Sequence, residues 1–256
     1  MRNGRKLKQL AALFTLAVMC LGLAGCGGEY AEEIKTINAG VNALAEVENG
    51  HLIMTGQTGA EEGKIPGFDG AYVYDYLYRI DVRTFNYQVE KRRLDEEGQP
   101  GELIEPAYRV IDAHKYDLAT GAEDEAYEGK IGDFPDLLPF YFGAGLKPGF
   151  VERVEALAPA ELGADESWQG WRVYKNEKYI NRVNSSRSKN GADGLMLENY
   201  VDYWLDGAGV LVRMDYVSRD AVSQTDETGS SLAEDILRQQ YSFCLVSYNQ
   251  PENAEF

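Results

Sequence analysis

The sequence has few of the residues that carry most enzymatic and metal chemistry. Its 256 residues include two histidines and three cysteines. His51 and His114 fall in separate predicted strands, so neither has an evident partner for a catalytic triad or a metal site. Acidic pairs such as Asp95 and Glu96 are expected by chance among 42 carboxylates. We therefore expect no catalytic residues, no metal, no cofactor and no enzymatic activity.

Positive charge is also scarce. The chain has 25 Lys and Arg against 42 Asp and Glu, a net charge of −17. The first 25 residues hold four of the basic residues and none of the acidic ones, so the remainder carries −21. Such a charge repels nucleic-acid phosphates and anionic lipid headgroups. We expect no nucleic-acid partner, and membrane attachment through a lipid rather than a basic patch.

Long hydrophobic runs are missing too. The apolar run 10–23 is shorter than the roughly 18–20 residues that a bilayer core requires. It follows a basic start and precedes Leu23-Ala24-Gly25-Cys26, the order typical of a signal peptide. These residues resemble the lipobox of bacterial lipoproteins, which implies cleavage before Cys26 and acylation of its thiol. We expect residues 1–25 to be a lipoprotein signal peptide, and the protein to be lipid-anchored at the extracytoplasmic face of a bacterial cell membrane.

Two alternatives remain for this segment, a retained membrane anchor and a secretory signal that leaves Cys26 free. With Cys20 removed and Cys26 acylated, Cys244 has no partner for an intramolecular disulfide. Cys244 is flanked by Phe243 and Leu245, so it is most simply a small buried hydrophobe.

An amphipathic helix is predicted directly after the cysteine. Between Glu29 and Glu48 the apolar positions recur at spacings of four and three, and Asn49-Gly50 is expected to end the helix. We expect 26–28 to be the lipidated cysteine with a short linker, 29–250 to be one domain and 251–256 to be a tail. Because the linker is short, the domain should lie close to its membrane.

After Gly50 the pattern changes to alternation, which predicts antiparallel strands. A polar loop is predicted at 219–231, and helical stretches at 179–183 and 232–240. The strands are predicted at 51–56, 71–83, 84–94, 107–118, 150–157, 168–175, 199–205, 210–218 and 241–248.

A row of tyrosines marks one face of the predicted strand 71–83, with Asp75 and Arg79 on the other face. Because the charged face must be the wet one, a core-facing row is the favoured interpretation. The alternative is a cavity lining, where apolar rings with polar tips bind amphiphiles or sugars. The row consists of Tyr72, Tyr74, Tyr76 and Tyr78.

The segment 133–142 is too aromatic for an exposed connector. Asp133 and Pro135 predict a helix start, and Pro139 limits its length. We expect a short apolar lid helix that closes over the tyrosine row. The candidate ligand-binding residues are therefore Tyr72, Tyr74, Tyr76, Tyr78, Leu138, Phe140, Tyr141 and Phe142.

The segment 117–133 is acidic and contains glycine, which raises the question of calcium. Its spacing does not match a calcium-loop template, so an exposed, solvated loop is the favoured interpretation. The carboxylates concerned are Asp117, Glu123, Asp124, Glu125 and Asp133.

The stretch from Tyr203 to Met214 reads YWLDGAGVLVRM, an aromatic strand, an Asp-Gly turn and a second strand. It is similar to a hairpin of the LolA/LppX-type lipoprotein-carrier superfamily, as is the closing stretch from Tyr241 to Asn249. The resemblance implies an α+β, mainly antiparallel fold, an incomplete (half) β-barrel with an N-terminal helix and a short lid helix that encloses acyl chains. Family carriers are soluble, so an anchored chain is expected to be a membrane-attached relative rather than a shuttle.

Together these patterns predict a non-enzymatic lipoprotein that binds an amphiphilic or apolar ligand, such as a lipid, in a half-barrel cavity. The alternative is an interaction or sensory module with a packed core, whose acidic surface contacts an envelope protein. A third reading, an envelope hydrolase, requires His114 or an acidic pair to lie in a cleft.

Overall fold

The computed structural model describes residues 28–60, 70–81, 84–95, 97–128, 145–162, 166–189, 194–225 and 231–256. The predicted lipidation site Cys26 lies outside the described residues. So does the predicted lid 133–142, with its candidate residues Leu138, Phe140, Tyr141 and Phe142.

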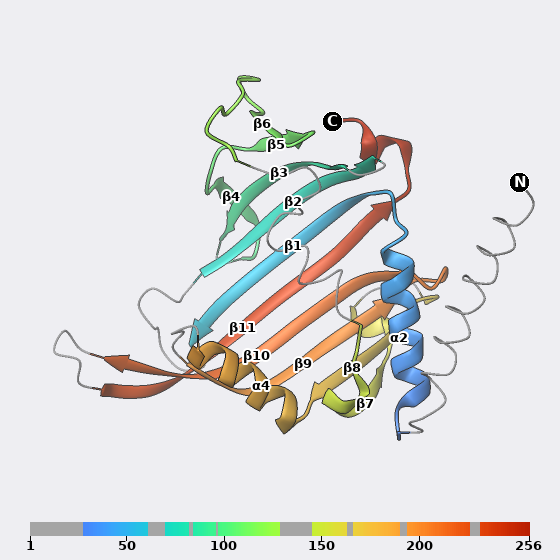
Figure 1. Ribbon diagram of the computed structural model, residues 1–256, viewed down its shortest axis with the longest axis vertical. Coiled ribbons are helices and arrows are strands. Elements are labelled where there is room, and N and C mark those ends of the chain that lie inside the picture. Colours follow the sequence, from blue (N-terminus) through green and yellow to red (C-terminus); the bar gives the residue numbers. More distant parts are fainter. Residues whose placement is uncertain are drawn as a thin grey trace, which may run out of the picture.

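All described strands join one antiparallel sheet (Figure 1). Its order is β6-β5-β3-β2-β1-β11-β10-β9-β8-β7, and β4 pairs with β3. Among the described residues the two edges of the sheet do not pair, so the sheet stays open and the predicted α+β half-barrel class is confirmed. The strands are β1 (Asn49–Ala60), β2 (Gly70–Asp81), β3 (Thr84–Leu94), β4 (Pro100–Leu103), β5 (Tyr108–Ile111), β6 (His114–Asp117), β7 (Val151–Leu157), β8 (Gln169–Lys175), β9 (Leu195–Leu205), β10 (Leu211–Thr225) and β11 (Ser231–Tyr248).

Two helices, α2 (Ala31–Leu44) and α4 (Glu177–Lys189), lie on the same face of the sheet (Figure 1). We call this the helix face and the opposite one the outer face. Short 3-10 turns occupy Pro148–Phe150, Pro159–Leu162 and Pro251–Ala254. Pro251–Ala254 contacts β1 and β2, where Arg79 donates a hydrogen bond to the carbonyl of Ala254.

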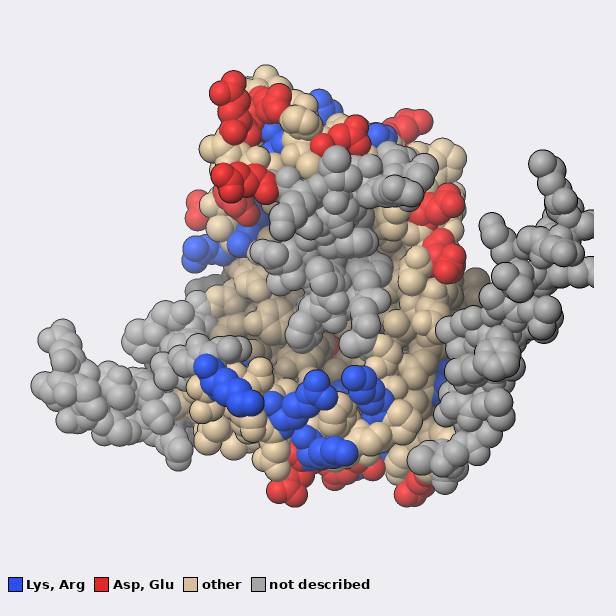
Figure 2. Space-filling model, viewed as in Figure 1, with Lys and Arg blue, Asp and Glu red and all other residues tan. Residues whose placement is uncertain are grey.

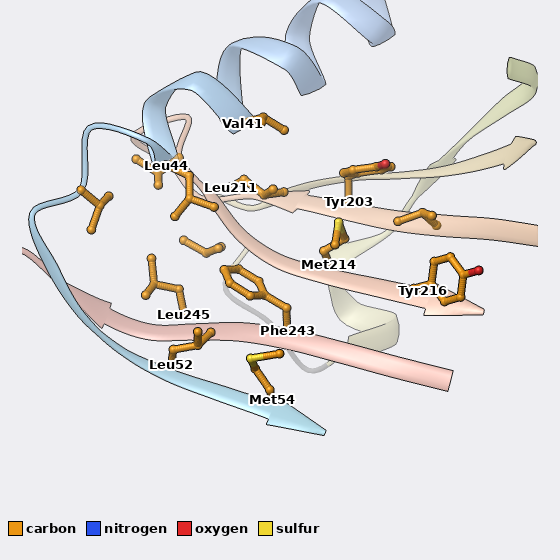
Figure 3. Packing of buried hydrophobic residues seen from close by; sticks show 14 of the residues in the cluster. Val41, Leu44, Leu52, Met54, Tyr203, Leu211, Met214, Tyr216, Phe243 and Leu245 are labelled. Atoms are coloured by element: carbon orange, nitrogen blue, oxygen red, sulfur yellow. The ribbon is translucent and has the colours of Figure 1, made fainter. Parts of the chain in front are cut away.

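The core lies between α2 and the helix face (Figure 3). One row of side chains crosses four strands in register, from Met54 through Phe243 and Met214 to Tyr203. All four are less than 9% exposed. On α2, Gly40 permits a close approach, because a β-carbon there would fall 2.6 Å from the Leu205 side chain. Burial of this apolar face is the main force that holds the helix on the sheet.

The predicted loop 219–231 and helix 232–240 are wrong. β10 runs on to Thr225, and β11 begins at Ser231 and pairs with it throughout. The ends of these strands form a two-stranded ribbon that projects beyond the sheet (Figure 1). Because a ribbon that projects has no sheet on either side, its residues are polar, which accounts for the loop-like composition.

Smaller differences concern element bounds. The predicted strand 107–118 is two strands, β5 and β6, joined by Asp112 and Ala113 with φ of 50° and 67°. The predicted helix 179–183 extends to the whole of α4, and the predicted helix 29–48 is confirmed as the shorter α2. Asn49 and Gly50, expected to end that helix, instead begin β1.

Candidate ligand-binding face

The four predicted tyrosines all point to the helix face. On β2 they stand opposite residues of β1 that face the core: Tyr74 is opposite Met54, and Tyr76 is opposite Leu52. Tyr76 and Tyr78 are 3% and 1% exposed and belong to the core. Tyr72 and Tyr74 are only half-buried. The row is thus structural at one end and accessible at the other.

The accessible end is a stack of rings. Tyr74 stacks on Tyr76 at 5.8 Å between ring centroids, and Tyr72 meets Tyr74 edge-on at 5.3 Å. The Tyr72 ring lies over Gly56, where a β-carbon would fall 2.3 Å from the ring. The ammonium of Lys91 lies 4.9 Å from the Tyr74 ring. Burial raises the pKa of Tyr72 to about 12, with Tyr241 and Tyr74 adding to it, so its hydroxyl stays neutral at physiological pH.

Two further tyrosines extend this surface. Tyr72, Gly56, Tyr241 and Tyr216 stand opposite one another on four adjacent strands. The rings of Tyr216 and Tyr241 are 6.0 Å apart. These two residues were missed as candidates, because a cross-strand row depends on register between distant segments. The available signal was their alternation with the core residues Met214 and Phe243.

Beyond the aromatic row, the helix face becomes polar beneath α4. The Asn184 side chain exchanges two hydrogen bonds with the backbone of Met196. Arg187 pairs with Asp220 at 3.1 Å, and the Asp220 side chain is 3% exposed. The Oδ1 atoms of Asn199 and Asp220 are buried with no hydrogen-bond partner. No residue of α4 is fully buried, so polar contacts contribute much of its attachment.

Lys175, beneath α4, gives a prediction on pH. Burial lowers its pKa to about 8, and its ammonium lies 5.5 Å from the Tyr179 ring. Below pH 8 the folded protein holds a charged, desolvated amine, and this cost disappears as pH rises from the folded pKa toward the unfolded one. We expect Lys175→Met to raise the free energy of unfolding by about 1–2 kcal/mol at about pH 7.

Urea denaturation should show this gain shrink by about 1 kcal/mol between about pH 7 and about pH 9, because the wild-type protein regains stability there. Lys189→Met, at an exposed lysine of α4, serves as the control and should show no such pH dependence. A gain that is constant with pH would mean that Lys175 is solvated.

The outer face carries ion pairs beside buried apolar side chains such as Trp204 and Val217. Arg172 forms two hydrogen bonds of 2.7 Å to Asp202, and Arg213 pairs with Asp215 at 2.8 Å. Cys244 stands opposite Arg213 and is half-buried rather than fully buried. Burial raises the pKa of its thiol, which disfavours the reactive thiolate.

His114 and the acidic loop form a cleft of about 520 Å³. His114 Nδ1 lies 2.7 Å from Glu123 Oε1, and both side chains are about half exposed. Among the described residues the lining contains no serine, threonine or cysteine. The other carboxylates face protein partners: Asp117 accepts hydrogen bonds from Thr120. The cleft is lined by Asp112, Ala113, His114, Glu123, Asp124, Glu125 and Tyr127.

Within the described ranges, no group of three or more potential ligands could hold a metal ion. His51, on the outer face, pairs with Asp75 at 2.8 Å. It lies on β1, whereas His114 lies on β6 at the edge of the sheet. In the described part of the chain, no helix has the length and apolar character needed to cross a bilayer.

Comparison with known proteins gives no family. No protein-family model and no curated protein matches the chain. LprF from Mycobacterium bovis is similar in structure at 12% identity and a TM-score of 0.45, over 86% of this chain and 94% of that one. A 12:0-ACP thioesterase from Umbellularia californica follows at 10% identity and a TM-score of 0.16, over 80% and 76%. The class of protein therefore rests on its own architecture, an open antiparallel sheet with two helices on one face.

Proposed function

We propose that this protein is a non-enzymatic, membrane-anchored lipoprotein that binds an amphiphilic or apolar ligand on the helix face. One observation carries the proposal: half-buried tyrosines from two strands, Tyr72 and Tyr74 of β2 and Tyr241 of β11, lie on either side of Gly56 of β1 on this face. Tyrosine rings offer apolar area, and their neutral hydroxyls offer hydrogen bonds, a combination suited to an amphiphile. The predicted lid 133–142 would close over this surface.

The proposed anchor is the acylated Cys26, two residues before Gly28. The resemblance to the LolA/LppX-type superfamily supports the binding of an apolar ligand, since it implies a half-barrel around acyl chains.

Loss of the accessible tyrosines should weaken ligand binding. The test uses the chain from residue 26 onward with Cys26→Ser, which keeps every described residue, and titrates it with a fluorescent fatty acid. We expect Tyr72→Ala and Tyr74→Ala each to raise the Kd about ten-fold, because each removes a ring from the surface.

Tyr200→Ala is the matched control. Tyr200 is a half-buried tyrosine in ring contact with Tyr174 at 5.6 Å, and it stands opposite Val217 on the outer face. Its replacement should leave the Kd unchanged. Failure of the parent chain to take up the probe, or equal weakening by Tyr200→Ala, would reject binding on the helix face.

The acidic cleft supports a second candidate, the interaction module. A surface that combines Glu123, Asp124 and Glu125 is complementary to a basic protein segment. A pull-down with immobilised polybasic peptide that weakens with salt, in a chain that takes up no amphiphile, would favour this candidate.

A further inference from the structure

Basic residues gather on α4, although the chain as a whole carries a net charge of −17. Lys178, Arg182 and Lys189 are all exposed, and Glu177 is the helix's one acidic residue. Figure 2 shows Lys and Arg side chains in a band across the lower part of this view, where Figure 1 places α4. Overall composition does not predict this local excess, because it averages the helix with its acidic surroundings.

These three cations have no ion pair with a carboxylate in the described part of the chain. Some exposed cations elsewhere are neutralised locally, as in the pair of Arg153 with Glu155 at 2.8 Å. Lys178 and Arg182 instead lie over the ring of Phe150, at 5.9 and 5.5 Å. An aromatic ring orients a cation without cancelling its charge, so the helix presents net positive charge to its surroundings.

Two exposed leucines lie beside this basic helix. Leu195 and Leu197, at the start of β9, are 55% and 46% exposed. Met196 between them is bound through its backbone to Asn184 of α4 and belongs to the core. Met196 stands opposite Asp220, which faces α4, so the leucines on either side of it point to the outer face. The basic surface therefore consists of α4 alone.

The start of α2 lies at the same end of the molecule as α4 (Figure 1). Gly28 is the described residue that precedes this helix, and it follows Cys26 by two positions. An acyl chain on Cys26 would therefore hold this end toward the bilayer. This step, and only this one, rests on the proposed function.

We propose that α4 is a docking surface for the surface of an anionic phospholipid bilayer. The attraction is local, since salt screens charges beyond about 8 Å at physiological ionic strength. Acidic side chains at the upper end of the view in Figure 2 lie far from the basic band, so their repulsion is screened, whereas those directly below the band are its neighbours. Lipid anchor and docking surface together orient the open sheet at the membrane, since stable attachment requires two signals.

Vesicle sedimentation tests this surface without the anchor. The chain from residue 26 with Cys26→Ser is mixed with vesicles of neutral phosphatidylcholine, or with the same lipid containing about 30% phosphatidylglycerol. We expect binding to the anionic vesicles only, and its loss as salt rises from about 0.05 M to about 0.5 M. Lys178→Glu/Arg182→Glu should lower partitioning about 30-fold or more, because each basic residue contributes about five-fold.

The matched control is Arg93→Glu/Arg238→Glu, the same change of charge at two exposed residues of β3 and β11. It should retain binding. Leu195→Ser/Leu197→Ser, on the outer face, should retain binding as well, and near-ultraviolet circular dichroism checks that each variant is folded. Equal loss in both charge variants, equal binding to neutral vesicles, or preference for an oligonucleotide over vesicles would overturn the inference. Amphiphile uptake without vesicle binding would also overturn the inference and leave the proposed function standing. Vesicle binding without amphiphile uptake would support the docking surface and contradict the proposed ligand-binding function.

Discussion

Phe243→Ala should lower the free energy of unfolding by about 3–5 kcal/mol. Phe243 is 0% exposed, and β11 is flanked by β1 and β10 in the interior of the sheet. Met54 and Met214 stand opposite it on the two neighbouring strands. Truncation removes the ring's burial energy and leaves a cavity between strands that cannot close on it. The two methionines are flexible enough to fill part of the space, which favours the lower half of the range.

Urea denaturation followed by tryptophan fluorescence measures the change. Val246→Ala is the control on the same strand, because Val246 is 57% exposed. Its effect should stay below about 0.5 kcal/mol. If Phe243→Ala changes stability no more than Val246→Ala does, the helix face beneath α2 is not a packed core.

Regular alternation made part of the fold predictable. The segments 71–82 and 85–89 each alternate regularly, and β3 was predicted at its observed bounds and β2 within two residues. Gly50 was misread because its role is tertiary. A β-carbon there would fall 2.7 Å from Leu245 and 2.9 Å from the Tyr78 ring, and neither contact is visible in the local sequence. The segments 222–225 and 231–236 were misread because the ends of β10 and β11, which no third strand flanks, have the composition of a loop.

The candidate site was predictable on β2 but not on the neighbouring strands. The direction of the tyrosine row follows from the period of one strand, so it could be inferred from β2 alone. Its continuation through Tyr241 and Tyr216 depends on how β1, β11 and β10 align, which local patterns do not determine. The basic character of α4 was hidden because net charge sums over the chain and carries no information on position.

Replacement of Arg187 by leucine should destabilise the protein by about 3 kcal/mol, because it leaves the buried charge of Asp220 without a partner. Arg187 comes from α4 and Asp220 from β10, and their side chains are 22% and 3% exposed. The Asp220 Oδ1 atom already has no hydrogen-bond partner. Loss of the guanidinium therefore leaves no compensation for the desolvated carboxylate.

The double variant Arg187→Leu/Asp220→Leu should recover most of that loss, because an apolar pair of similar volume needs no compensation in a buried site. A double-mutant cycle, with each free energy measured by urea denaturation, gives the coupling between the two residues. Lys35→Ala is the control, since its pair with Glu32 is 63% and 86% exposed and should contribute less than about 0.5 kcal/mol. A double variant as unstable as Arg187→Leu alone would mean that the leucines do not pack, and that α4 is held by Asn184 and its aromatic contacts instead. The predicted recovery would show that the Arg187–Asp220 pair fixes where α4 sits on the sheet more than how strongly it binds.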